Sequence, residues 1–186
     1  MALTPSTMLP LGTLAPAFAL PDVVTGQTVT LPAAAPATVV MFICNHCPYV
    51  KHVLNGLIAL GNDYVARGVA VFAISSNDAD HYPDDRPEAM RALAVARRFP
   101  FPYLYDQSQA VAKAYQAACT PDFFVFDGAL KLAYRGELDD ARPGNGKPVT
   151  GRAIRAALDA LLTGDEVDAA QTPSVGCNIK WKSTAR

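Results

Sequence analysis

The sequence predicts an α/β fold in which a central mixed β-sheet is covered by helices on both faces. Stretches typical of strands and helices alternate along the chain without a linker or an internal repeat, an order that favours strands joined by helices. Two β-branched apolar runs, residues 38–43 and 69–74, are typical of buried strands. Two further runs, residues 123–126 and 131–134, flank an Asp-Gly pair and predict an antiparallel hairpin.

The first half of the chain is expected to hold an opening hairpin, two strands and two helices. Short apolar runs at residues 17–20 and 28–31 predict the hairpin. The first buried strand is followed by Pro48, which suits the first turn of a helix because its missing N–H costs nothing there. The second buried strand leads through a polar loop to a helix at residues 87–99. Apolar residues at helical spacing follow Pro48: Val50, Val53, Leu54, Leu57, Ile58 and Val65.

The second half completes the sheet and adds two helices. Residues 103–105 predict a short strand and residues 108–117 a helix, before the hairpin around Asp-Gly. Thr150 is expected to cap a last helix that Gly164 closes. The apolar stripe of this helix consists of Ile154, Leu158, Leu161 and Leu162.

The composition indicates one globular domain, residues 1–186, in which residues 165–186 form a C-terminal tail packed on the body. A hydrophobic fraction of 51% is typical of a folded chain, and 186 residues are enough for a sizeable core. A net charge of −1 without long Lys/Arg blocks argues against nucleic acid as a partner, and no apolar run has the length of a membrane span. Because no Lys or Arg precedes the first apolar residues, we expect no secretory signal and a cytoplasmic protein.

Two cysteines stand at the junction between the first buried strand and its helix, in the sequence Cys44-Asn45-His46-Cys47-Pro48. The N-terminus of a helix supplies unpaired N–H groups and partial positive charge, both of which stabilise a thiolate. Since the thiolate is the reactive form of cysteine, this position favours thiol–disulfide exchange. Cytoplasmic thiols are normally reduced, so a CxxC pair in that compartment is more often catalytic than structural.

A structural disulfide and half of a zinc site are the alternatives for Cys44 and Cys47. A structural zinc site usually needs a second close pair of Cys or His residues, and the sequence has none. We therefore expect neither a metal nor another cofactor.

Thr120-Pro121 stands just before the strand at residues 123–126, and together with the CxxC it makes the chain resemble the thioredoxin fold, in which a cis-proline loop faces the cysteines. The segments FICNHCPYVKH, ISSND, CTPDFFVFD, YRGELDD and PSVGCNIKW are similar to the peroxiredoxin-like branch of the alkyl hydroperoxide reductase/thiol-specific antioxidant (redoxin) superfamily. The resemblance implies a redox protein with a thioredoxin-like three-layer sandwich and an N-terminal β-hairpin extension. It also implies that Pro121 holds a substrate strand by backbone contacts and denies the cysteines a metal.

One departure from peroxiredoxins bears on the activity. Their peroxide-reacting cysteine closes a Pro-x-x-x-Thr/Ser-x-x-Cys pattern and corresponds to Cys47, which leaves Val40 at the Pro position and Cys44 at the Thr/Ser position. A thiol–disulfide oxidoreductase is therefore the leading interpretation. The alternatives are an antioxidant thiol peroxidase with Cys47 as the peroxidatic residue, and a metal carrier that uses the CxxC with His46 or Cys177.

In the leading interpretation Cys44 attacks a substrate disulfide, because we expect it to be the more exposed cysteine of the pair. Cys47 then resolves the mixed disulfide from within the first helical turn. His46 either favours the thiolate electrostatically when protonated or is an exposed spacer. The implied partners are a disulfide-containing protein or small molecule as substrate, and a thioredoxin or glutathione system as reductant.

Two further cysteines are candidates for additional exchanging thiols. Cys119 lies two residues before Pro121, so the fold would bring it near the CxxC; the alternative is that it packs as a small apolar residue. Cys177 lies in the tail. Either the tail folds back and places this thiol over the active site, or Ile179 and Trp181 simply anchor the tail to the body.

Overall fold

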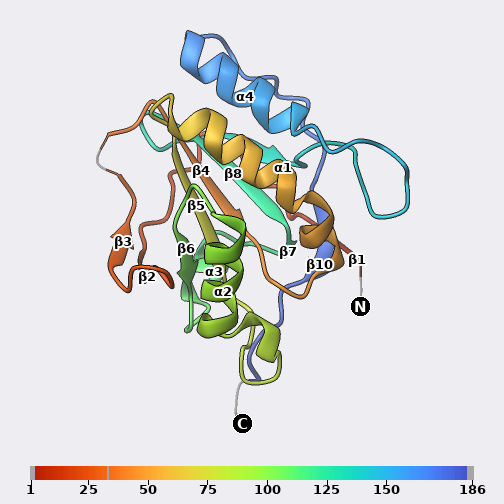
Figure 1. Cartoon of the computed structure of the whole chain (residues 1–186). Helices are drawn as coiled ribbons and strands as arrows, with labels where there is room; N and C mark the ends of the chain where they lie inside the picture. Colours follow the sequence, from red (N-terminus) through yellow and green to blue (C-terminus); the bar gives the residue numbers. More distant parts are fainter. Residues whose placement is uncertain (1–2, 33, 184–186) are drawn as a thin grey trace.

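The computed structural model describes residues 3–32 and 34–183, and its centre is a mixed five-stranded β-sheet (Figure 1). The strands stand in the order β6-β5-β4-β8-β9. β4 (Ala37–Phe42), β5 (Ala70–Ser75) and β6 (Tyr103–Tyr105) run parallel, whereas β8 (Asp122–Asp127) and β9 (Leu132–Gly136) are antiparallel to their neighbours. The predicted mixed sheet and its terminal hairpin are confirmed.

Side chains of the central strand β4 alternate between two core clusters, because successive residues of a strand point to opposite faces of the sheet. Met41 belongs to the cluster that α1, α2 and α4 cover, and Phe42 to the cluster on the other face, to which α3 contributes. Helices therefore cover both faces, as predicted, in a three-layer arrangement (Figure 1). The helices are α1 (Pro48–Val65), α2 (Pro87–Arg97), α3 (Ala110–Ala114) and α4 (Arg152–Thr163).

Three helices differ from the sequence prediction at their ends. α2 ends at Arg97, two residues before the predicted end, because Arg98 adopts left-handed backbone angles. α3 is shorter than the predicted 108–117, because Gln109 and Gln116 adopt left-handed backbone angles on either side of it. α4 has Gly151 rather than Thr150 as its N-cap. The buried carboxylate of Asp139 accepts the N–H groups of both residues at 2.6 Å, which ties the helix start to the preceding loop. No helix of residues 3–32 and 34–183 is long and apolar enough to cross a membrane.

The N-terminal extension is a separate two-stranded sheet. β2 (Ala19–Pro21) pairs with β3 (Thr28–Thr30) in antiparallel register, with Leu20 opposite Val29. Asp22, at the end of β2, accepts hydrogen bonds from the turn at Thr25 and from the main chain of Tyr103, which fixes the hairpin to β6. The predicted hairpin is confirmed, with slightly different ends.

The C-terminal tail returns to the body and forms a strand that the sequence did not reveal. β10 (Val175–Asn178) lies between β1 (Leu3–Pro5) and β7 (Cys119–Thr120) and is antiparallel to both. Ile179 beside it is 1% exposed, whereas Trp181 is 42% exposed. Main-chain pairing and Ile179 hold the tail, and the more exposed Trp181 ring lies with its centroid 5.8 Å from the Lys113 Nζ of the body.

Candidate active site

The CxxC segment leaves the middle of the sheet where β4 passes into α1. The Ile43 N–H still donates to the Ile74 carbonyl at 2.9 Å, so strand pairing continues up to the residue before Cys44. Cys47 is the N-cap of α1 and Pro48 is its first residue. The cysteines therefore occupy the strand–helix junction that the sequence predicted, and Cys47 lies beside the unpaired N–H groups of the helix end.

A cis peptide bond between Thr120 and Pro121 places the β7–β8 loop opposite the two cysteines. The Thr120 carbonyl oxygen lies 3.1 Å from the Cys47 Sγ, and the Thr120 Oγ1 lies 3.4 Å from the Cys44 Sγ. Thr120 therefore contacts both sulfur atoms. This is the arrangement that the resemblance implied for Thr120 and Pro121.

The edge of β7 that was expected to receive a substrate strand is already occupied. β10 pairs with it, so that Cys177 lies opposite Thr120 and Asn178 opposite Cys119. The carbonyl of Pro121 accepts a hydrogen bond from the Ser174 hydroxyl at 2.7 Å. On this edge of β7 the chain's own tail strand makes the main-chain contacts that the resemblance assigned to a substrate strand.

Both CxxC side chains are buried. Cys44 is 1% exposed and Cys47 is fully buried, so the expectation of a clearly more exposed Cys44 is wrong. Thr120 and the tail strand cover the pair. Cys44 nevertheless borders a pocket of about 250 Å³ between α1 and α2, and Cys47 does not line it. The other lining residues are Asn45, Val50, Lys51, Leu54, Leu93 and Arg97.

The two thiols share one proton unequally. The pKa of Cys47 is lowered to about 4, above all by the hydrogen bond that Cys44 donates, which outweighs the opposing effect of burial. The pKa of Cys44 is raised well above its ordinary value, first because its proton is held by Cys47 and then by burial and the charge of Asp85. These shifts favour the ionised form of Cys47 over that of Cys44, whereas the contact between the Cys47 Sγ and the Thr120 carbonyl oxygen uses the protonated form of Cys47. Weaker donors to Cys47 are Cys177, the Val50 N–H and Thr120.

His46 is held against a carboxylate that the sequence analysis missed. Its Nδ1 lies 2.5 Å from the Asp85 Oδ2, and its ring stacks on Tyr82 with the ring centroids 5.2 Å apart. The His46 side chain is only 13% exposed, so it is not an exposed spacer. Burial acts to raise the pKa of Asp85, but the hydrogen bonds from His46 and Asn77 outweigh it and lower this pKa.

Asp85 joins three parts of the site. It is fully buried and accepts hydrogen bonds from the main-chain N–H groups of Asn45 and His46 at 2.7 and 3.3 Å. Its other oxygen accepts the Asn77 amide at 2.8 Å, and the Asn77 Oδ1 accepts the Lys180 N–H of the tail at 2.8 Å. The CxxC loop, the end of β5 and the tail are thereby linked through one carboxylate. No local pattern around Asp85 predicted this, because its partners lie some 40 residues upstream.

The two remaining cysteines differ in their contacts. Cys177 donates a hydrogen bond to Cys47, and burial raises its pKa to about 12. Cys119 is equally buried, but its Sγ lies 3.5 Å from the Pro121 carbonyl and 4.0 Å from the Ser174 carbonyl. None of the four cysteines is in a disulfide bond in the structure. The tail therefore does place a thiol on the CxxC, whereas Cys119 packs beside the proline loop.

The side chains of Cys44, His46 and Asp85 bring three candidate ligand atoms within 4.8 Å of one another. This is not the CxxC set considered for a metal carrier, because Cys47 is absent from it. The Asp85 oxygens already accept four N–H groups, from two main-chain amides, His46 and Asn77. Hydrogen bonding alone accounts for the cluster, and the donor set gives no support to metal transport.

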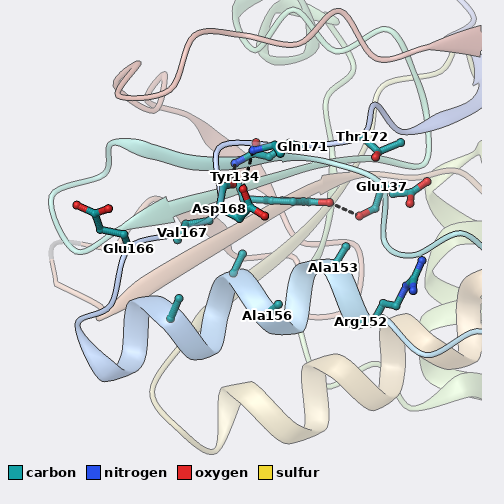
Figure 2. A pocket seen from close by; sticks show the side chains of 13 residues that line it. Tyr134, Glu137, Arg152, Ala153, Ala156, Glu166, Val167, Asp168, Gln171 and Thr172 are labelled. Carbon is teal, nitrogen blue, oxygen red and sulfur yellow. Dashed lines mark hydrogen bonds between the residues drawn. The ribbon is translucent and has the colours of Figure 1, made fainter.

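A larger cavity, of about 640 Å³, lies away from the cysteines, between α4 and the segment that leads to the tail strand. Figure 2 shows the Tyr134 ring crossing it toward Glu137, whose carbonyl accepts the tyrosine hydroxyl at 2.5 Å, and alanines of α4 forming its floor. No cysteine lines this cavity. The redox chemistry of the chain is therefore assigned to the smaller pocket at Cys44.

The fold and the paired thiols opposite a cis-proline define a thioredoxin-fold redox protein. A model of the AhpC/TSA family matches residues 11–135, and the chain belongs to this family within the redoxin superfamily. No curated protein sequence matches the chain.

Solved structures similar to this chain share its fold. An uncharacterized conserved protein from Geobacillus kaustophilus is 58% identical, with 100% of this chain and 99% of that chain covered and a TM-score of 0.97. A hypothetical protein from Sinorhizobium meliloti 1021 is 50% identical over 97% of this chain and 99% of its own, with a TM-score of 0.94. A putative thiol:disulfide interchange protein DsbE from Chlorobium tepidum shares the fold at 20% identity, covering 83% of this chain and 99% of that chain with a TM-score of 0.62.

Proposed function

We propose that this protein is a thiol–disulfide oxidoreductase in which Cys44 and Cys47 form a reversible disulfide. The observation that carries the proposal is the position of both sulfurs at the start of α1 against the cis-proline loop, with Thr120 atoms 3.4 Å from the Cys44 Sγ and 3.1 Å from the Cys47 Sγ. We take Cys47, whose pKa is lowered, as the group that receives the proton of Cys44 as Cys44 attacks.

Cys44 is the attacking residue in this proposal, because it borders the pocket and Cys47 does not. As the Cys44 Sγ bonds to one sulfur of the substrate disulfide, its proton passes to Cys47 and the other substrate sulfur leaves as a thiolate. Cys47 returns the proton to this leaving group, then attacks the Cys44 Sγ and expels the second substrate thiolate. Two electrons pass to the substrate, and the protein is left with a Cys44–Cys47 disulfide.

The remaining groups position this pair. Thr120 contacts both sulfurs, and Asp85 fixes the main chain of Asn45 and His46 between them. We assign a disulfide-containing protein or small molecule as substrate and a cytoplasmic thioredoxin or glutathione system as reductant, because the dithiol has to be regenerated after each turnover.

Trapping the intermediate tests this order of attack. With oxidised glutathione, Cys47→Ser should accumulate a glutathione adduct on Cys44, because the resolving thiol is missing. Cys44→Ser should lose the turnover of glutathione disulfide, while Cys119→Ser, a change in an equally buried thiol, should keep it. Mass spectrometry of alkylated peptides reads out the adducts. Full turnover in Cys44→Ser would remove the dithiol mechanism.

A thiol peroxidase that uses Cys47 is the second candidate, favoured by the low pKa of this N-cap sulfur. Against it, the Thr/Ser of the peroxiredoxin pattern is replaced by Cys44, and Val40 is a buried residue of β4 in the core cluster on the far side of the sheet. A positioned hydroxyl for the bound peroxide is therefore missing from that place. Stopped-flow mixing with hydrogen peroxide should give a rate typical of a simple thiolate; a rate many orders of magnitude faster would favour the peroxidase.

A further inference from the structure

The tail strand β10 brings a third thiol to the dithiol. Cys177 is the register partner of Thr120, whose carbonyl oxygen lies 3.1 Å from the Cys47 Sγ. Cys44, Cys47 and Cys177 belong to the same buried core cluster. The strand that carries Cys177 therefore lies directly beside the residue that contacts both CxxC sulfurs.

A glycine allows β10 to lie close to Thr120. A Cβ atom on Gly176 would lie 2.0 Å from the Thr120 carbonyl oxygen, so any other residue there would push the two strands apart. The strand is also fixed at both ends, by the hydrogen bond from Ser174 to Pro121 and by the one from the Lys180 N–H to Asn77. Cys177 is thus held in place and is not a passing contact of a loose tail.

Only one of the two remaining cysteines contacts the dithiol. Cys177 keeps its proton and is paired with Thr120 beside Cys47, which acts to raise the pKa of Cys177, whereas Cys119, on the neighbouring strand, is directed to the carbonyls of Pro121 and Ser174. Disulfide bonds form between sulfurs that already meet with suitable geometry. The structure therefore singles out Cys177 as the partner for Cys47.

We propose that Cys177 is a third exchanging thiol, which moves the Cys44–Cys47 disulfide to Cys47–Cys177. The Cys177 sulfur attacks the Cys47 Sγ, the bond between Cys44 and Cys47 breaks, and Cys44 leaves as the thiolate that takes up the proton of Cys177. The step is an isomerisation: the protein stays oxidised by two electrons, and no outside oxidant or reductant is consumed.

This exchange would change which sulfur is available at the pocket. In the Cys44–Cys47 disulfide the pocket-lining sulfur is blocked, whereas in the Cys47–Cys177 disulfide Cys44 is a thiol again. The thiol of Cys44 is then free to form a mixed disulfide with a second substrate molecule, while the protein keeps the disulfide between Cys47 and Cys177. The inference rests on the proposed dithiol function but concerns a different bond.

Peptide mapping of Cys44→Ser tests the pairing, because this variant cannot form the CxxC disulfide. Trypsin releases Cys47 in residues 1–51 and Cys177 in residues 156–180, so a Cys47–Cys177 bond joins two peptides that are otherwise separate. After oxidation with diamide, a small reagent that converts neighbouring thiols to a disulfide, followed by alkylation and digestion, we expect these two peptides to be linked. The matched control Cys44→Ser/Cys119→Ser should keep the link, and Cys44→Ser/Cys177→Ser should lose it.

The same mapping on the unmodified chain tests the exchange itself. Equilibration with oxidised glutathione should give both a 1–51 peptide with an internal disulfide and a measurable fraction linked to 156–180. Absence of the linked peptide from both proteins, with Cys177 fully alkylated after unfolding, would overturn the inference even if glutathione disulfide is turned over normally. Linked peptides without any such turnover would instead support the Cys47–Cys177 pairing and refute the proposed oxidoreductase function.

Discussion

The uneven sharing of one proton between Cys44 and Cys47 gives the sharpest prediction. With its pKa at about 4, Cys47 should be about 99.9% thiolate at pH 7, whereas a thiol of pKa 9.0 would be about 1% ionised. The thiolate absorbance near 240 nm should therefore persist on acidification and be half lost near pH 4. Cys44→Ala removes the largest stabilising hydrogen bond, so its Cys47 pKa should move upward toward the ordinary thiol range.

The lowered pKa of Cys47 also changes the reduction potential of the Cys44–Cys47 couple. Between pH 7 and a pKa of about 4, three pH units correspond to about 4 kcal/mol in favour of the reduced, ionised protein. For a two-electron couple this raises the reduction potential by about 90 mV relative to a pair of ordinary thiols. Equilibration against mixtures of reduced and oxidised glutathione, followed by alkylation, measures the potential in the parent protein and in Cys119→Ser as a control.

The lowered pKa of Cys47 also predicts how the free energy of unfolding of the reduced protein depends on pH. Because the folded pKa lies below that of an unfolded thiol, the unfolded chain binds the extra proton at intermediate pH. The stabilisation of the reduced protein is complete above pH 9 and declines as the pH falls, until it is lost near pH 4. The oxidised protein lacks both thiols, and because the pKa of Cys44 is raised, the difference between the two unfolding curves below pH 9 reports the ionisation of Cys47. A 240 nm midpoint above pH 8, or a low midpoint that survives in Cys47→Ala, would refute the assignment of the charge to Cys47.

Three further predictions concern the surroundings of the dithiol. Arg135→Leu should lower the free energy of unfolding by about 3–5 kcal/mol in chemical denaturation, because it leaves the Asp122 carboxylate buried without the guanidinium 3.2 Å away; unchanged stability would show that this ion pair contributes nothing. Asp85→Asn should lower the free energy of unfolding by about 2 kcal/mol, because a neutral amide replaces a carboxylate that accepts four N–H groups. A decrease smaller than that of the exposed control Asp84→Asn would contradict the role of Asp85 in holding the site together. Lys51 lines the pocket beside Cys44, so Lys51→Glu should slow the reaction with oxidised glutathione, an anion, more than the reaction with cystamine, a cationic disulfide. Stopped-flow mixing measures both rates. Equal changes in the two rates would show that substrates do not enter through this pocket.

The features that the sequence predicted are those encoded within a few neighbouring residues. The apolar run before Cys44 and the Pro48 after Cys47 specify the strand–helix junction locally, and the Asp-Gly pair specifies the β8–β9 hairpin. The Thr120-Pro121 step was found only through the resemblance to a known fold.

The features that the sequence did not reveal depend on contacts between distant segments. β1 and β10 are three and four residues long, and they form because β10 pairs with β1 on one side and with β7 on the other. The burial of Cys44 was missed because Thr120, which lies 76 residues away in sequence, contacts its sulfur. Asp85 carries no signal of its own, since what makes it part of the site is its position beside Asn45 and His46 in space.

The close approach of Gly176 to Thr120 gives a criterion for sorting related sequences. A relative with any larger residue at the position of Gly176 cannot bring its tail as near to the proline loop, because the added carbon would collide with the Thr120 carbonyl. Its β7 edge would then be open to other chains, and a cysteine at the position of Cys177 would stand too far from the dithiol. The residues at the positions of Gly176 and Cys177 therefore divide the family into two groups. In one group the tail of the same chain covers the proline loop, and in the other the loop is open to a partner.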